Sequence, residues 1–191
     1  MFIPLCIAAV AAGQSPTQLV IKTGDAVPGN PSSTFGDVRP GAIDNANRVL
    51  LWANFEDTES VTGQGLFEWS EGTVTPIVVR GDAAPGVAGG TFRSFISTVA
   101  GTINDQGDVA FLAFVELAGR EQTSVLRSVW LRSGEGLTLL ALEGGILPGL
   151  AEGQELIGTP TGPVLNQQGV AVFRASIVDA EEPTAVVGAG I

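Results

Sequence analysis

Six carboxylates are the residues of this chain that could catalyse a reaction, and the chemistry they suggest is glycoside hydrolysis. A glycosidase uses one Asp or Glu as a general acid and a second as a base or nucleophile. The available acids are Asp57, Glu59, Asp82, Asp108, Glu152 and Glu155. None of them lies in a singular, non-repeating motif, and acids distributed among turns are usually solvated. We therefore expect no catalysis and assign no catalytic residue.

Metal and covalent chemistry have little support in the composition. The chain has no histidine, and Cys6 is its one cysteine, which excludes Ser-His-Asp and Cys-His catalytic groups, histidine-based zinc sites and an intramolecular disulfide. Residues 44–47 and 104–108 resemble oxygen-rich calcium loops. The corresponding residues 166–169 contain no acid, however, and the spacing fits no known calcium loop. The sequence therefore assigns no metal-ligating and no cofactor-binding residue, and structural calcium stays an open alternative.

Three tryptophans could stack on sugar rings or pack in a core. Trp69 and Trp130 occupy neighbouring positions of a repeated pattern, in segments that are predicted to be strands. Trp52 lies in another predicted strand, residues 49–55. Core packing is the commoner fate of an aromatic side chain in a strand. We expect Trp69 and Trp130 in the core, with sugar stacking as the alternative.

A polar marker that occurs three times shows that these residues belong to a repeat. It begins at Asp44, Asn104 and Asn166, with offsets of 104 − 44 = 60 and 166 − 104 = 62. The first Asn side chain can accept a hydrogen bond from the backbone two residues on, and Gly107 can adopt the left-handed conformation that closes a short hairpin. An apolar run follows each marker and is continuous enough to be a strand buried on both faces.

A second marker recurs in phase with the first. It starts at residues 24, 81 and 144, with offsets of 81 − 24 = 57 and 144 − 81 = 63, and each copy contains a Pro-Gly pair. That pair suits a type II turn, because Pro presets φ and Gly supplies a positive φ. The third copy has Gly145 where the other two have an acid. Two markers that recur in phase identify a repeat protein.

Short apolar and β-branched runs between Gly, Asn, Asp and Pro clusters predict an all-β fold. In the middle copy the predicted strands are residues 91–99, 109–115, 128–132 and 137–142. In the first copy they are residues 49–55, 65–69 and 74–79. No stretch has helical spacing, and we expect residues 116–127 to form a long loop.

Four antiparallel strands repeated at about sixty residues are typical of a propeller blade. Residues 18–22 match a fourth strand, and residues 185–191 match a third, so the two ends could complete one blade together. Only three blades would result, whereas propellers typically have about four to eight. We therefore expect a partial, propeller-like array, which is either a fragment or an assembly that closes by association.

The middle marker, Asn104-x-x-Gly107-x-x-Ala110-Phe111, resembles a bacterial family of exported tandem-repeat proteins that contain NxxGxxAF, called choice-of-anchor proteins. The flanking second marker and the residues that follow it also look like that repeat. The resemblance covers residues 18–191 nearly throughout, although the first copy is degenerate and the third has Val172 for Ala. It implies a secreted or surface β-repeat protein without established enzymatic activity. No C-terminal anchor of that family is recognisable here.

Residues 1–13 predict a signal peptide, because an apolar run ends in small residues and is too short to span a bilayer. A buried N-terminal strand is the alternative. Residues 18–191 form a single predicted β-repeat domain with markers near 44, 104 and 166. The mature chain contains no further run long enough to cross a membrane.

The formal charge is 9 − 20 = −11, and Lys22 is the one lysine. Such a chain repels phosphate backbones, so nucleic acid is not an expected partner. We expect an exported, non-catalytic scaffold or binding module, secreted or at the cell surface, whose ligand is a glycan or a protein. The alternative is a carbohydrate-active enzyme or a lectin-like propeller. Self-association and continuation of the repeat array both stay open.

Overall fold

The computed structural model describes residues 5–8, 18–56, 62–96, 101–118, 124–145, 154–179 and 186–190. These residues form antiparallel sheets and contain no helix. The all-β prediction is therefore confirmed, including strands at residues 109–115 and 137–142.

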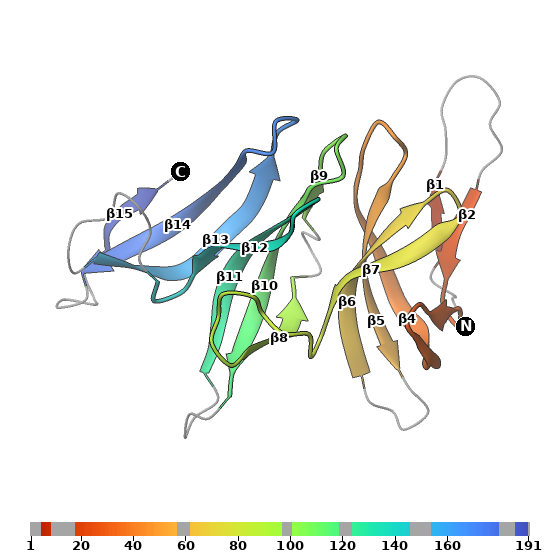
Figure 1. Cartoon of the computed structure of the whole chain (residues 1–191), viewed down its shortest axis with the longest axis horizontal. Helices are drawn as coiled ribbons and strands as arrows, with labels where there is room; N and C mark the ends of the chain where they lie inside the picture. The colour runs from red at the N-terminus through yellow and green to blue at the C-terminus, as the bar shows by residue number, and fades with distance from the viewer. Residues whose placement is uncertain are drawn as a thin grey trace.

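Three sheets follow one another along the chain and stand in a row (Figure 1). The first contains β3 (Ala26–Val27), β4 (Asn30–Ile43), β5 (Val49–Glu56), β6 (Thr62–Ser70) and β7 (Thr73–Val79). The second contains β8 (Gly90–Phe95), β9 (Thr102–Ile103), β10 (Val109–Leu117), β11 (Ser124–Ser133) and β12 (Gly136–Leu142). The third contains β13 (Gln154–Leu165), β14 (Ala171–Asp179) and β15 (Val186–Gly190). In each sheet the strands pair with their neighbours in chain order, apart from β9, which pairs with β10 beside β8.

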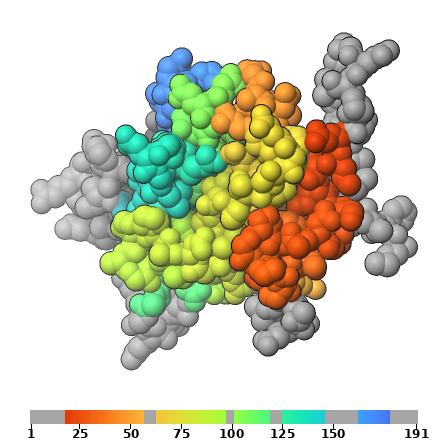
Figure 2. All heavy atoms as spheres, turned by 45° about the vertical axis from the view of Figure 1, so that its right-hand side comes forward, coloured from red at the N-terminus to blue at the C-terminus, as the bar shows by residue number. Residues whose placement is uncertain are grey.

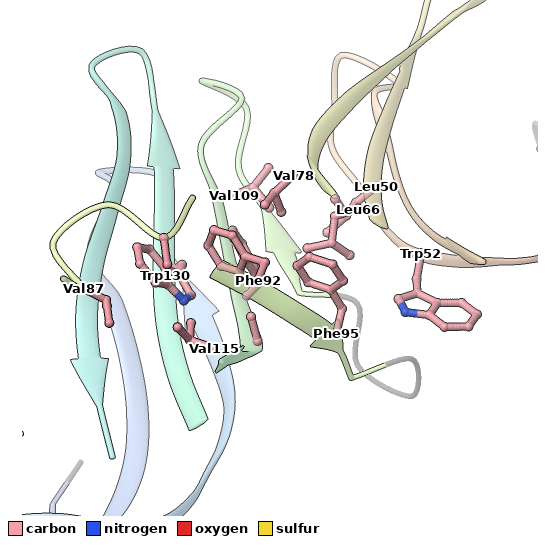
Figure 3. Packing of buried hydrophobic residues seen from close by; sticks show 13 residues of the cluster. Leu50, Trp52, Leu66, Val78, Val87, Phe92, Phe95, Val109, Val115 and Trp130 are labelled. Carbon is pink, nitrogen blue, oxygen red and sulfur yellow. The ribbon is translucent and has the colours of Figure 1, made fainter. Parts of the chain in front are cut away.

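The first two sheets pack face to face, because the long central strand of each is apolar on both sides. β5 and β10 both have the burial pattern of a strand covered on its two faces. Leu50 and Leu66 of the first sheet belong to the same buried cluster as Phe92, Phe111 and Trp130 of the second. Figure 3 shows this cluster between the two sheets. The prediction of a strand buried on both faces is confirmed for β5 and β10, and it is wrong for β14, where Val172 is 44% exposed.

The pairing register repeats from sheet to sheet. Ala53 lies opposite Gly65, and Ala113, which is 60 residues further on, lies opposite Ser128. Ala175, another 62 residues on, lies opposite Gly190. The third-strand assignment of the segment from residue 185 is therefore confirmed for β15.

Two sequence-based expectations were wrong in extent. Half of the loop predicted over residues 116–127 is strand: Glu116 lies opposite Val125, and Leu117 lies opposite Ser124. Residues 119–123 lie outside the described residues. Cross-strand pairing overrides the polar composition there. The strand β4 was not recognised, because its Gly and Pro residues mark the positions of register irregularities between Phe35 and Val38 and between Pro40 and Ile43. Residues 97–99, which were predicted to extend β8, lie outside the described residues.

A separate two-stranded sheet pairs β1 (Leu5–Ala8) with β2 (Gln18–Lys22). Val20 and Ile21 of β2 pack against the first sheet, on the side away from the second. β2 and β15 thus lie at opposite ends of the row, and they do not complete one blade within the chain as the sequence suggested (Figure 1). The pairing of β1 agrees with the alternative of an N-terminal strand, whereas export stays a prediction.

Candidate functional site

The three copies of the first marker form tight turns of the same construction. In the middle copy, Asn104 Oδ1 accepts hydrogen bonds from the backbone N–H of Gln106 (3.0 Å) and Asp108 (2.9 Å). The Gly107 N–H donates to the Asn104 carbonyl, and Gly107 has φ of 87°. The predicted Asn side-chain bond and left-handed glycine are both confirmed.

The other two copies close their turns with the same atoms. Asn166 Oδ1 accepts from Gln168 N–H and Val170 N–H, both at 2.9 Å. In the first copy Asp44 Oδ1 accepts from Arg48 N–H at 2.8 Å, and Asn47 takes the left-handed place of the glycine with φ of 62°. Asn tolerates this conformation better than most residues, so the degenerate copy keeps the turn.

The three turns lie side by side along one edge of the row, in orange, green and blue in Figure 2. Asp105 accepts from Asn45 through both oxygens: Oδ1 from the backbone N–H at 2.9 Å and Oδ2 from Nδ2 at 2.8 Å. The Asp105 N–H in turn donates to Gln167 Oε1 at 2.9 Å. The second residue of each turn therefore binds the second residue of the next. We call this series the turn ladder.

Arg48 is the cation of the turn ladder. Its Nε donates to Asp44 Oδ2 at 2.6 Å, and its Nη2 donates to the backbone oxygens of Asn104 (3.3 Å) and Asp105 (2.7 Å). The Asp44 side chain is fully buried in this contact. Because a Cβ on Gly107 would collide with Arg48 Nη1, the guanidinium occupies space that only a glycine leaves open.

Hydrogen bonding from Asn45 lowers the pKa of Asp105 below its ordinary value of 3.8, and the Gln167 bond and the charge of Arg48 act in the same direction. The carboxylate is thus ionised at neutral pH and engaged with neighbouring turns. It is an unsuitable general acid, because a general acid at neutral pH needs a raised pKa.

The solvent side of the turn ladder presents polar side chains. Each turn exposes a carboxamide side chain. Gln106 and Gln168 hold the same place in their turns, and Asn47 lies one residue further along the first turn. A carboxamide offers both a donor and an acceptor. The surface can therefore form hydrogen bonds with hydroxyl or peptide groups of a ligand.

The second marker is structural in the two copies that the structure describes. Asp25 Oδ2 accepts from Lys22 N–H (3.0 Å), and Asp82 Oδ2 accepts from Val79 N–H (2.8 Å). The glycines of the first two Pro-Gly pairs, Gly29 and Gly86, both have φ of 81°, which fits the predicted type II turn. The third Pro-Gly pair lies outside the described residues.

The six candidate acids are not gathered into one described site. Asp82 lies in the second marker, whereas Asp108 accepts from Asn104 Nδ2 in the turn ladder at 3.0 Å. The backbone of Glu155 lies in β13. The other three, Asp57, Glu59 and Glu152, lie outside the described residues.

The tryptophans are core residues. Trp52, Trp69 and Trp130 are 5%, 6% and 0% exposed, so none has a ring face available for a sugar. Trp130 Nε1 donates to Ser128 Oγ at 2.8 Å within the core. The core prediction for Trp69 and Trp130 is confirmed, and the sugar-stacking alternative is wrong for all three.

A model of a family of unknown function, DUF7453, matches residues 7–191. The chain belongs to this family. No curated protein and no solved structure matches the chain. The family match covers all three turns of the ladder, so the ladder is part of the DUF7453 domain.

Within the described part of this DUF7453 chain, no group of three or more Cys, Asp or Glu residues could hold a metal ion. The same residues include no helix with the length and hydropathy needed to cross a bilayer.

The contacts between turns were not predicted from the sequence. Asn45, Asp105 and Gln167 hold the same place in their markers, and each is polar with a side chain long enough to reach an adjacent turn. Aligning the copies would have identified them. Their partners could not be assigned until the packing of the sheets was known.

Proposed function

We propose that this chain is an exported, non-catalytic scaffold and binding module whose sheets form a partial, propeller-like array. Each sheet is a blade in this proposal, and the turn ladder holds the three blades in register. The observation that carries the proposal is that the polar groups of the repeated turns bind one another. Asp44, Asp105 and Asp108 all accept hydrogen bonds within the ladder.

The proposed binding surface is the exposed side of the turn ladder, at Asn47, Gln106 and Gln168. A rigid scaffold that presents loop residues is the usual support for recognition. The exposed carboxamides favour a neutral, hydroxyl-rich or peptide ligand. The net charge of −11 disfavours polyanions such as nucleic acids.

Export to the cell surface or medium is part of the proposal. It is supported by the apolar run over residues 1–13 and by the resemblance of the repeats to the NxxGxxAF family. Cell fractionation with a carboxy-terminal epitope tag tests it. Retention of the tagged chain in the cytoplasm would contradict export.

A glycan array probed with residues 14–191 tests the binding role. We expect signals on a subset of glycans that fall at least tenfold for the double variant Gln106→Ala, Gln168→Ala. Thr75→Ala, at an exposed position of β7 away from these turns, is the matched control and should bind like the wild type. An array without signal, together with no captured protein from the cell envelope, would leave only the scaffold role.

The non-catalytic part is tested with a panel of chromogenic glycosides. We expect no turnover above a buffer control. Turnover that Asp82→Asn or Asp108→Asn abolishes, with unchanged thermal unfolding, would instead support the carbohydrate-active alternative.

A further inference from the structure

The second sheet ends in a strand with one unpaired side. β12 pairs with β11 and is the last strand of its sheet. Among the described residues, no strand lies against the other side of β12. Alternate backbone N–H and C=O groups of such a strand point away from the sheet, so they can pair with a further strand. We call this side of β12 the open edge.

The first sheet ends in the equivalent strand, and a proline blocks its edge. β7 is the last strand of that sheet. Pro76 of β7 lies opposite Phe67, and Leu139 of β12 lies opposite Trp130, each next to a register shift. The offset 139 − 76 = 63 is that of the second marker. Proline cannot donate a backbone hydrogen bond, and natural sheets use it at edges to prevent strand addition.

The comparison with β7 identifies a donor of the open edge. A proline in an edge strand lies where its nitrogen faces away from the neighbouring strand. The nitrogen at position 76 therefore faces away from β6. Because Leu139 holds the same place in the repeat, its backbone N–H faces away from β11. This N–H is available to an added strand, whereas β7 has no donor at that position.

Leucine side chains flank the open edge on both faces of the sheet. Leu137 and Leu139 pack against the cluster between the first and second sheets, and Leu140 packs against the cluster between the second and third. All three are half-buried, so each leaves part of its side chain for an added strand to cover. β12 contains no charged residue and no proline. It thus lacks the residues with which natural sheets block pairing.

Two acids stand at the ends of this strand. Glu135 precedes β12 at an exposed position of the turn, and Glu143 follows it. The Glu143 carboxylate is held in place, because its Oε2 accepts from the Arg127 N–H at 3.0 Å. The corresponding residues beside β7 are Glu71 and Arg80, so β12 has an acid at both ends and β7 does not. A ligand extended along the open edge would meet a negative charge at each end.

The same acids disfavour a second copy of this chain as the ligand. If two β12 strands paired antiparallel about Leu139, Glu135 of each copy would lie opposite Glu143 of the other, because 135 + 143 = 139 + 139. Like charges that lie directly opposite each other destabilise a pair of strands. The net charge of −11 on each copy adds to this repulsion.

We propose that the open edge binds an extended segment of another protein, which adds to the second sheet as a further strand. That segment has apolar side chains at alternate positions, which cover the leucines, and a basic residue near each end, which meets Glu135 or Glu143. Backbone hydrogen bonds supply affinity in this mode of recognition, and side chains supply specificity. No residue of the turn ladder takes part, so the inference goes beyond the binding role proposed above.

Fluorescence anisotropy of a labelled peptide, titrated with the full chain, tests the proposal. The peptide has the length of the segment from Glu135 to Glu143, which is 143 − 135 + 1 = 9 residues. It has Lys at both ends and alternating Val and Thr between them. We expect saturable binding. The same peptide with Glu at both ends should bind about tenfold more weakly, because two surface attractions become repulsions.

Two substitutions at one position separate the backbone from the side chain. Leu139→Pro copies the native residue of β7 and removes the N–H of the open edge, whereas Leu139→Ala keeps this N–H. Both variants lose the leucine side chain. We expect Leu139→Pro to abolish binding of the Lys-ended peptide and Leu139→Ala to retain measurable binding. Thermal unfolding of both variants checks that they fold.

Charge reversal at one end of the strand provides an independent test. Glu135→Lys should weaken binding of the Lys-ended peptide about fivefold and strengthen binding of the Glu-ended peptide, because one surface attraction becomes a repulsion. Glu71→Lys makes the same change in the turn between β6 and β7. It is the matched control, and both affinities should stay at the wild-type values.

Four results would overturn the proposal. The folded wild type could fail to bind the Lys-ended peptide. Leu139→Pro could bind it as well as Leu139→Ala does, which would show that the N–H is not used. Glu135→Lys and Glu71→Lys could weaken it equally, which would reduce the effect to overall charge. A dimer mass in light scattering that Leu139→Pro abolishes would show that a second copy occupies the open edge. None of these outcomes alters the glycan-array result.

Discussion

Asp105 accepts two hydrogen bonds from Asn45, at 2.9 Å and 2.8 Å, although 60 residues separate the two positions. That separation is the period of the repeat. A backbone N–H and a carboxamide of one turn therefore bind the carboxylate of the equivalent turn in the next sheet. Such contacts add directional hydrogen bonds to the apolar packing between the sheets.

Asp105→Asn should lower the urea midpoint of unfolding at neutral pH. The folded-state pKa of Asp105 is below its ordinary value of 3.8, so its contribution to stability is complete above that value. It is lost as the pH falls through the lowered folded-state pKa. Urea titrations at pH 7 and well below pH 3.8 should show a difference between variant and wild type that shrinks in acid. An equal difference at both pH values would exclude the charge as its source.

Gly107→Ala should destabilise the protein more than Gly72→Ala does. Both glycines have a positive φ, 87° and 85°, so each variant carries backbone strain of about 1–2 kcal/mol. A Cβ at position 72 meets no atom within 4 Å, whereas one at 107 would displace the Arg48 guanidinium from the turn ladder. Chemical denaturation of the two variants measures the difference. Equal losses would mean that the Arg48 contacts contribute nothing.

Trp130→Ala should cost about 3–5 kcal/mol of unfolding free energy, because it removes a fully buried indole from between two sheets. Phe92 packs against this ring, with centroids 4.9 Å apart. Val125→Ala, at a 37% exposed position, should change the unfolding free energy by less than about 0.5 kcal/mol. Thermal and urea unfolding provide the measurement, and a small loss at Trp130 would contradict the described core.

Glu68 and Arg132 should be coupled across the first two sheets. Their side chains are 14% and 29% exposed, and the guanidinium Nη2 lies 2.5 Å from the carboxylate. A double-mutant cycle with Glu68→Gln and Arg132→Gln should give a coupling of about 1 kcal/mol that falls with added salt. If the losses of unfolding free energy in the two single variants add up to the loss in the double variant, the two side chains do not interact.

Local backbone requirements made the turns predictable. An Asn that bonds to a nearby backbone N–H and a Gly with a positive φ suit few structures other than a tight turn. The bonds of Asn104 Oδ1, the φ of Gly107 and the strand that follows could therefore be predicted. The repeat register predicted β15 as a third strand for the same reason, since the copies share one local pattern.

Contacts between distant segments were not predictable in this way. Residues 116–127 were predicted to be a loop from their local sequence. The pairing of Glu116 with Val125 and of Leu117 with Ser124 depends on β10 and β11 lying side by side. Trp69 and Trp130 were expected in the core, and the packing of the sheets places Trp52 inside as well.

The residue types of this chain therefore determine its local features, which are the turns, the strands and the three copies of the repeat. The use of Asp105 was decided by a neighbour sixty residues away. Asp105 has no local partner that would mark it, and it acquires one only when face-to-face packing brings Asn45 within hydrogen-bonding distance. Burial and cross-sheet hydrogen bonding depend on which surfaces meet, and that arrangement exists only in the folded chain.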